Sequence, residues 1–74
     1  MTKQIDIQEL IPYLRDGWVA MDKTGRWYWY DRSIIPERNH WVFRNGGDNI
    51  YPLANIKQVS DWTKSLIKVE NKDA

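Results

Sequence analysis

Aromatic and arginine side chains are the residues of this chain whose types and spacing favour binding chemistry. Residues 27–30 read Trp-Tyr-Trp-Tyr and directly follow Arg26, while Trp18 opens an apolar run in the same stretch. Tyrosine, tryptophan and arginine are enriched in the hot spots of protein interfaces, and exposed aromatic rings also stack on nucleic-acid bases. This stretch therefore predicts a binding surface.

Residues for nucleophilic catalysis and for metal binding are scarce by comparison. The chain contains no cysteine and one histidine, His40, and no serine stands at a spacing from it that favours a catalytic triad. The same composition excludes an ordinary structural zinc site within one chain. Residues 22–25 lack the alternating oxygen ligands of a calcium loop and are typical of a turn. We therefore expect no catalytic residue, no metal, no cofactor and no enzymatic activity.

Composition predicts one small domain in a reducing compartment. The chain has 74 residues, enough for a single domain with a thin core, and no cysteine to form a disulfide. Five Trp, four Tyr and one Phe supply aromatic bulk instead, since each ring buries about 150–250 Å². A net charge of +1 indicates neither nucleic acid nor an anionic membrane as partner. Because no apolar run resembles a signal peptide or a membrane span, we expect a cytoplasmic protein that contacts no membrane.

Residues 18–30 predict a β-hairpin whose strands, 18–22 and 26–30, are joined by a three-residue loop with Gly25 in the left-handed position. This loop pairs Trp18 with Tyr30. Since side chains alternate between the two faces of a strand, every second residue shares a face. One face then carries Val19, Met21, Trp27 and Trp29, and the other carries Trp18, Ala20, Tyr28, Tyr30 and an Asp22–Arg26 pair.

The segment before the hairpin predicts a short helix. Asp6 and Glu9 have the spacing of a capping box, and Pro12 interrupts the helical pattern. We expect a helix over residues 6–15 that breaks near Pro12 and ends at Gly17 in a left-handed conformation. Its apolar face consists of Ile7, Leu10, Ile11 and Leu14.

The segment after the hairpin predicts a loop and a third strand. Residues 31–39 contain Pro36 and several charged residues, which are typical of a loop, and we expect Ile34 and Ile35 to tuck inward from it. Residues 40–44 alternate as a strand does, with Trp41 and Phe43 on one side.

The remainder of the chain is less regular. Residues 45–48 predict a turn, and residues 50–51 a short fourth strand that Pro52 halts and confines to the edge of the sheet. Residues 60–70 fit a helix capped by Ser60 or a strand over their last four positions, and both alternatives stay open.

These elements together predict an α+β fold: a small antiparallel sheet of three to four strands with an N-terminal helix packed on one face. Residues 1–70 form the single domain and residues 71–74 a disordered tail. The expected core consists of Trp27, Trp29, Trp41 and Phe43 under Leu10 and Leu14, with Trp62 as a further core residue. The candidate binding residues lie on the opposite face: Trp18, Arg26, Tyr28, Tyr30, His40 and Arg44.

Three stretches of the chain carry a family resemblance. These are residues 17–22 (GWVAMD), Gly25 with residues 27–30, and the closing residues 61–67 (DWTKSLI). With them the chain resembles a loose class of small phage- and prophage-encoded proteins. The resemblance implies a phage accessory protein in the host-cell cytoplasm, a setting in which such proteins bind a host protein, a defence protein or a signalling nucleotide. The class has no assigned catalytic residues to carry over.

The leading hypothesis is therefore a non-catalytic module that binds another protein, or a second copy of itself as a homodimer, through the aromatic sheet face. The alternative is a nucleotide or single-stranded nucleic-acid binder, with Tyr28 and Tyr30 stacking on bases and Arg26 and Arg44 contacting phosphate. A structural part of a virion is a third reading. Ordinary cross-strand pairing on a solvated sheet face would explain the same aromatic residues without any partner.

Overall fold

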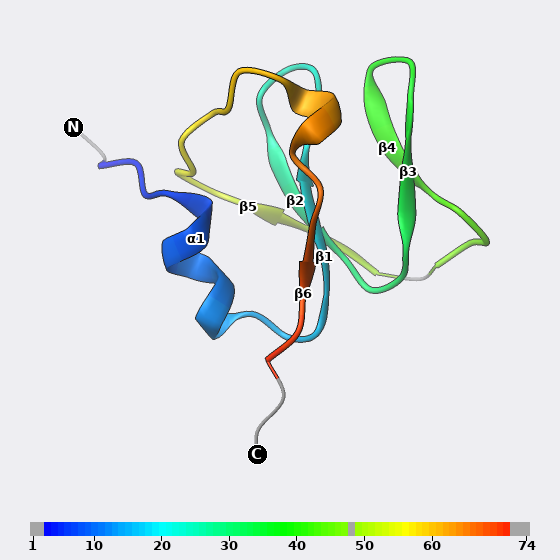
Figure 1. The fold of residues 1–74 in the computed structure, drawn as a ribbon, viewed down its shortest axis with the longest axis horizontal. Coiled ribbons are helices and arrows are strands. Elements are labelled where there is room, and N and C mark those ends of the chain that lie inside the picture. Colours follow the sequence, from blue (N-terminus) through cyan, green and yellow to red (C-terminus); the bar gives the residue numbers. More distant parts are fainter. Residues whose placement is uncertain (1–2, 48, 72–74) are drawn as a thin grey trace.

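Among residues 3–47 and 49–71, which the computed structural model describes, six strands form two antiparallel sheets beside one short α-helix. The larger sheet has the strand order β5-β2-β1-β6, and β3 pairs with β4 in the smaller sheet (Figure 1). The α+β class is thus confirmed, with more strands than the three to four expected. The elements are α1 (Ile7–Leu10), the 3₁₀ helix η1 (Ile11–Tyr13), β1 (Gly17–Met21), β2 (Trp27–Tyr30), β3 (Ile34–Glu37), β4 (His40–Phe43), β5 (Ile50–Leu53), the 3₁₀ helix η2 (Trp62–Lys64) and β6 (Ile67–Val69).

The β1–β2 hairpin has the register that the sequence predicts, from Trp18 opposite Tyr30 to Met21 opposite Trp27. Gly25 adopts a φ of +93°, and its N–H donates to the carbonyl oxygen of Asp22 at 3.0 Å. This is the conformation that a side chain would strain, so glycine is required here.

The N-terminal helix begins with the predicted capping box. The Asp6 carboxylate accepts from the N–H of Gln8 at 2.8 Å, and the Glu9 carboxylate accepts from the N–H of Asp6 at 3.0 Å. Pro12 lies in the first turn of η1, where a backbone N–H has no partner within the helix. The α-helix therefore ends at Leu10 and continues as a 3₁₀ turn that ends at Tyr13.

Gly17 does not end this helix, contrary to the prediction, because it is the first residue of β1. A Cβ atom at Gly17 would lie 2.6 Å from the backbone oxygen of Tyr30 and 2.7 Å from the Trp29 indole. The position requires glycine because the backbone of β2 and a tryptophan ring approach closely, and not because of a left-handed conformation.

Residues 31–39 are not simply a loop, because Ile34–Glu37 form β3 and pair with β4. Ile34 is buried, as expected, and lies opposite Phe43. Pro36 and the charged flanks obscured this strand in the sequence; Pro36 is tolerated because a two-stranded ribbon consists only of edge strands. The tips of the two hairpins are joined by a hydrogen bond from the N–H of Lys23 to the carbonyl oxygen of Asn39 at 2.9 Å.

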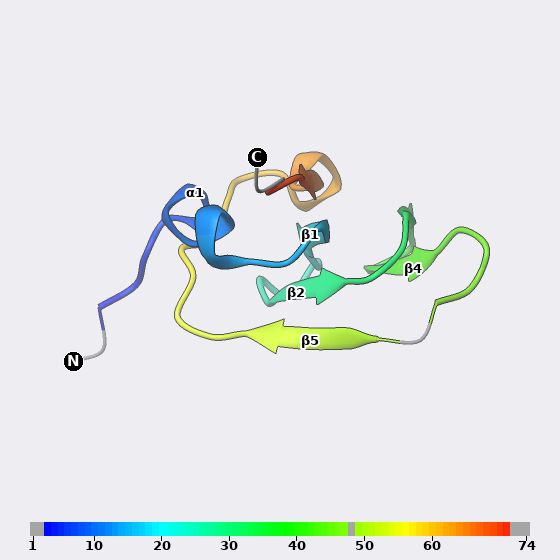
Figure 2. The same cartoon turned by 90° about the horizontal axis from the view of Figure 1, so that it is seen from below.

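The larger sheet buries apolar side chains on both faces. Figure 2 shows α1 on one side of β1 and the β3–β4 hairpin on the other. Trp41 and Phe43 therefore lie on the face opposite to Trp27 and Trp29, which corrects the expected single core. The cluster under α1 comprises Ile7, Val19, Met21, Trp27, Trp29, Ile56 and Val69, and the cluster under the β3–β4 hairpin comprises Ala20, Tyr30, Ile34 and Trp41.

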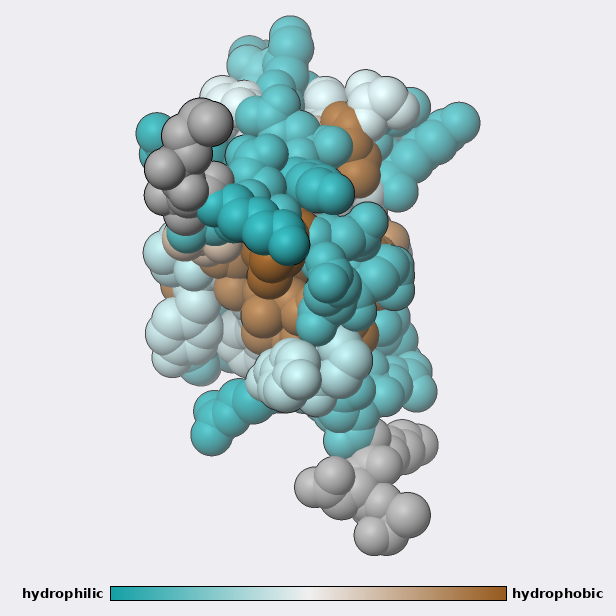
Figure 3. All heavy atoms as spheres, turned by 90° about the vertical axis from the view of Figure 1, so that its left-hand side faces the viewer, coloured by the Kyte–Doolittle hydropathy of each residue, from teal (hydrophilic) through white to brown (hydrophobic). Residues whose placement is uncertain are grey.

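The cover of the first cluster is incomplete at the surface. Ile5, Leu10, Ile11 and Leu14 pack against this cluster but are only partly buried. Figure 3, which looks at the side of the molecule where α1 lies, shows apolar surface in the centre of this face with polar side chains around it. A helix of one turn is too short to cover a sheet face completely.

Strand β5 occupies an edge of the sheet, as Pro52 predicts, but it continues through Pro52 to Leu53. The N–H of Asp31 donates to the carbonyl oxygen of Asn49 at 3.2 Å, so the backbone of Asn49 faces β2. In an antiparallel pair every second residue of a strand faces its partner, and Tyr51 and Leu53 therefore also direct their backbone N–H and C=O groups toward β2. Pro52 then faces away from β2, where its missing N–H removes no ladder bond. Asp48, at the end of the predicted turn, lies outside the described residues.

The C-terminal segment contains both alternatives in sequence, a 3₁₀ turn and then a strand. Asp61, rather than Ser60, caps η2 by accepting from the N–H of Thr63 at 3.0 Å. Asn71 is held by three hydrogen bonds, to the Asp16 carboxylate and to the carbonyl oxygens of Ile11 and Leu14. The rest of the predicted tail, residues 72–74, lies outside the described residues.

Ser65, which precedes β6, satisfies a backbone group of β1 beyond the end of the β1–β6 pairing. The β1–β6 pairing stops at Val19 opposite Ile67, and two residues further along β1 the Ser65 hydroxyl accepts from the N–H of Met21 at 2.8 Å. The hydroxyl proton lies within reach of the carbonyl oxygens of Trp62 at 2.6 Å and of Met21 at 3.1 Å. A buried side chain thus replaces a strand residue.

Replacing Ser65 by alanine should destabilise the fold by about 1–3 kcal/mol, because it leaves the buried N–H of Met21 without a partner. Urea unfolding followed by tryptophan fluorescence measures the change. The matched control is Ser60→Ala at an exposed position, which should stay within about 0.5 kcal/mol of the wild type. Equal stabilities for the two variants would contradict the role assigned to Ser65.

Candidate functional site

The predicted aromatic face of the hairpin is largely enclosed. Tyr30 is only 3% exposed, and its ring meets Phe43 edge-on with 5.7 Å between centroids. The β3–β4 hairpin covers this face, so Tyr30 is a core residue and cannot contact a partner. The expectation that it faces solvent is wrong because the sequence did not show which hairpin would pack there.

Burial changes the chemistry of Tyr30 as well as its exposure. The pKa of Tyr30 is raised from its ordinary value of 10.0 to about 12. Desolvation by burial is the largest cause, and the nearby charges of Asp22 and Tyr28 add to it. The phenol therefore stays neutral to a higher pH than an exposed tyrosine does, as suits a side chain that packs in the core.

The other predicted site residues are separated by the fold. Trp18 is half-buried in β1, and the ammonium of Lys68 lies 5.4 Å from its ring centroid. His40, the first residue of β4, and Arg44, which directly follows β4, are both exposed beside the smaller sheet. Arg26 and Tyr28 remain together near the turn of the β1–β2 hairpin, Arg26 exposed and Tyr28 half-buried.

The predicted Asp22–Arg26 pair is a backbone arrangement at the hairpin turn. The N–H of Asp22 donates to the carbonyl oxygen of Arg26 at 2.9 Å. The Asp22 carboxylate accepts from the backbone N–H groups of Thr24 and Arg26, at 2.9 and 3.1 Å, and from the Thr24 hydroxyl. The carboxylate is thus engaged in the turn, and the guanidinium of Arg26 extends from an ordered backbone.

An apolar groove between η1 and β5 is a surface that sequence reasoning missed. Its exposed aromatic members are Tyr13, 84% exposed, and Tyr51, 53% exposed, and Trp29 is its buried floor. The groove has a volume of about 190 Å³. We call it the aromatic groove, and it is lined by Tyr13, Leu14, Arg15, Trp29, Tyr51 and Leu53. Alternation along residues 50–53 would have placed Tyr51 with Trp29 had the β2–β5 pairing been known.

The floor of the aromatic groove is held firmly. The indole N–H of Trp29 donates to the carbonyl oxygen of Arg15 at 3.1 Å, which ties β2 to the residue that follows the N-terminal helices. Tyr51 packs on the Trp29 ring with 5.6 Å between centroids and 32° between planes. The groove therefore exists before any partner arrives.

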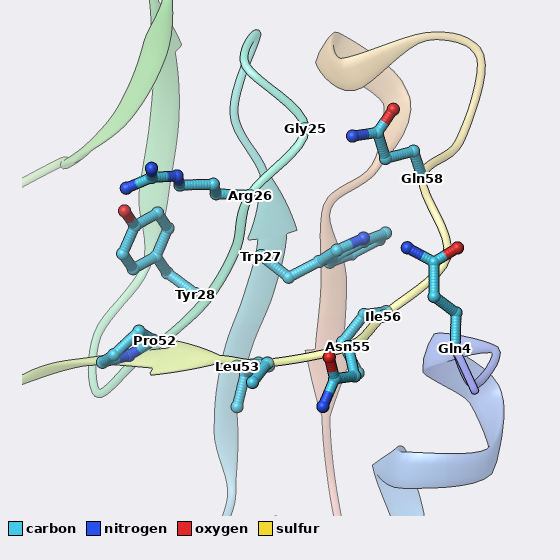
Figure 4. A pocket seen from close by; sticks show the side chains of 11 residues that line it. Gln4, Gly25, Arg26, Trp27, Tyr28, Pro52, Leu53, Asn55, Ile56 and Gln58 are labelled. Carbon is cyan, nitrogen blue, oxygen red and sulfur yellow. The ribbon is translucent and has the colours of Figure 1, made fainter. Parts of the chain in front are cut away.

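A second concave surface lies beyond the end of the β2–β5 pairing. We call it the amide pocket; its volume is about 340 Å³, and three carboxamides, from Gln4, Asn55 and Gln58, contribute to its lining. Figure 4 shows Arg26, Tyr28 and Pro52 on one side of this pocket and Trp27, Gln4 and Gln58 on the other. Its remaining lining residues are Gly25, Leu53, Ala54 and Ile56.

Features of other site classes are few in the part of the chain that the structure describes. Within residues 3–47 and 49–71, no three or more histidine, aspartate or glutamate side chains gather as metal ligands would. Over the same residues, no helix has the length and apolar character needed to cross a membrane.

Comparisons with known proteins do not assign a family. No protein-family model matches the chain, and neither the curated proteins nor the solved structures contain a match.

Raising the pH should destabilise the protein in a way that depends on Tyr30. Its raised pKa means that its contribution is fully present below pH 10.0 and is lost as pH rises toward about 12, because the unfolded chain releases the phenol proton first. Urea unfolding at a series of alkaline pH values should show this loss, and Tyr30→Phe should reduce it. The matched control, Tyr13→Phe, removes an exposed phenol; an equal effect of both variants would contradict the assignment.

Proposed function

We propose that the protein is a non-catalytic binding module that docks an apolar side chain of a protein partner in the aromatic groove. The observation that carries the proposal is the exposure of Tyr13 and Tyr51 around a buried, hydrogen-bonded Trp29. A small domain gains stability from each aromatic ring that it buries. Two large aromatic side chains exposed on one groove therefore indicate that they bind a partner rather than stabilise the fold.

The composition and rigidity of the groove support the same function. Tyrosine and tryptophan dominate interface hot spots, and a groove that is already ordered loses little conformational entropy on binding. Arg15 at its rim favours a partner with an acidic group beside its apolar side chain.

The edge of β5 favours side-chain docking over the addition of a strand. Between Ile50 and Leu53, the outward-facing backbone belongs to Ile50 and Pro52, and Pro52 has no N–H to donate. An edge with so few donors is a poor template for a new strand. The affinity would therefore come from the rings of Tyr13 and Tyr51.

The wider setting is part of the proposal. The resemblance to phage- and prophage-encoded proteins supports an accessory role in the host cytoplasm, and the partner is then a host protein, a defence protein or a second copy of this chain. A homodimer is the self-complementary version, because two grooves related by a two-fold axis would cover each other's exposed tyrosines.

Peptides selected from a random library on the immobilised full chain should carry an aromatic or aliphatic residue near an acidic one. Tyr13→Ser and Tyr51→Ser should each weaken their binding by at least about tenfold, the scale of an interface hot spot. Isothermal titration measures the affinities. Sedimentation of the wild type over a range of concentrations, with the same variants, tests the homodimer.

The matched control is Val59→Ser, which removes an apolar side chain that is 40% exposed and lies outside the groove. It should leave peptide affinity unchanged. A monomeric wild type whose selected peptides bind equally well to both tyrosine variants would overturn the proposal.

A further inference from the structure

We propose that the amide pocket is a separate ligand site that takes a mononucleotide, with the base against Tyr28 and Pro52, its edge toward the carboxamides, and the phosphate near Arg26. The site is distinct from the aromatic groove, and its occupancy does not depend on the proposed protein-binding function.

The pocket exists because two segments that leave the sheet diverge. The β2–β5 pairing ends at Trp27 opposite Leu53. Beyond that point β2 is preceded by the turn at Gly25, while the other chain continues through Asn55, which adopts a left-handed φ of +61°. The opening of about 340 Å³ is at the lower end of the roughly 300–1,000 Å³ that is usual for small-ligand sites.

Hydrogen bonds hold the wall that carries the carboxamides. The N–H of Ile5 donates to the carbonyl oxygen of Asn55 and the N–H of Lys57 to that of Ile5, both at 2.9 Å, which fixes Gln4 beside Asn55. The indole N–H of Trp27 donates to the carbonyl oxygen of Lys57 at 3.0 Å and ties this wall to β2.

The turn and the wall fit closely together at Gly25. A Cβ atom at this position would collide with the carboxamide of Gln58. The Gln58 side chain therefore lies directly against the hairpin turn, on the side of the pocket where Figure 4 shows it. The pocket has two walls that are set by backbone contacts, with side chains of defined position between them.

The lining groups match the parts of a nucleotide. Each carboxamide offers a donor and an acceptor, which is the pattern that reads the edge of a base. The ring of Tyr28 and the ring of Pro52, its cross-strand neighbour, provide flat apolar surface for stacking. The guanidinium of Arg26 supplies the charge-assisted donors that phosphate prefers.

The charge around the pocket favours one phosphate rather than a long strand. All of its lining residues are neutral or basic. Exposed lysines adjoin them in the sequence at Lys3 and Lys57, and the carboxylate of Asp22 is engaged by the turn. A strand requires many phosphate contacts and a clear basic excess, which a net charge of +1 does not supply.

Two-dimensional NMR of the full chain tests the site directly, because the side-chain NH₂ groups of Gln4, Asn55 and Gln58 and the indole N–H of Trp27 give separate signals. The probes are AMP, GMP, CMP and UMP, the corresponding nucleosides, and inorganic phosphate. We expect saturable shifts of these signals with at least one nucleotide at concentrations up to the millimolar range, and weaker shifts with its nucleoside.

Arg26→Gln should lower the affinity for that nucleotide by about tenfold or more, as expected for loss of one charge-assisted hydrogen bond, and leave the nucleoside affinity nearly unchanged. Gln58→Ala should weaken both ligands. The matched control is Arg44→Gln, at an exposed arginine that directly follows β4 and does not line the pocket, and it should change neither affinity.

The proposal is overturned if no nucleotide gives saturable shifts, if inorganic phosphate binds as well as the nucleotide, or if Arg44→Gln weakens binding as much as Arg26→Gln. Tighter binding of oligonucleotides than of any mononucleotide, with a steep salt dependence, would also overturn it in favour of a strand-binding surface. Peptide binding in the aromatic groove is unaffected by Arg26→Gln in every case, so the two proposals fail separately.

Discussion

Strand β1 is the element against which the rest of the domain packs. Val19 and Ala20 are completely buried, one on each face of the sheet, and β1 has a neighbouring strand along both edges. Where its pairing with β6 stops, the carbonyl oxygen of Met21 accepts from the indole N–H of Trp41 at 3.0 Å, and Ser65 satisfies the N–H. Both faces and both edges of one short strand must therefore be covered at once. The α1 segment covers one face and the β3–β4 hairpin the other. Strand β2 pairs with one edge, and the C-terminal segment covers the other.

This constraint determines where the domain can bind anything. Trp27, Trp29 and Tyr30 are buried in the two cores, and Trp18 and Tyr28 are buried in part. The surfaces that remain for binding are therefore at the rims of the sheet, where strand pairing ends. Trp62 illustrates how fully the interior uses its aromatic residues: it packs against both cores and meets Trp41 edge-on at 6.1 Å. The aromatic groove lies beside the outer strand β5, and the amide pocket lies beyond the last pair of β2 and β5. At such rims the backbone is ordered by the sheet on one side and open to a ligand on the other.

Sequence patterns correctly predicted the elements that depend on interactions between residues close together in the chain. The register of the β1–β2 hairpin follows from a three-residue loop and a glycine, and the capping box follows from Asp6 and Glu9 three positions apart. Pro52 indicated an edge strand for a local reason too, because it has no N–H. Strand β3 was missed since Pro36 and charged residues occupy positions that face solvent, and its only apolar signal was the Ile34–Ile35 pair.

The order of residues along the hairpin is enough to divide its aromatic side chains into two alternating sets, because side-chain direction along a strand has a period of two. Alternation did not show that each set would contribute buried rings, Trp27 and Trp29 on one face and Tyr30 on the other. That outcome depends on the β3–β4 hairpin packing over Tyr30 and on the helical segment packing over Trp29, and both contacts join residues more than ten positions apart. Alternation is a property of one strand, whereas burial is a property of what packs on it, and only the tertiary structure supplies the second.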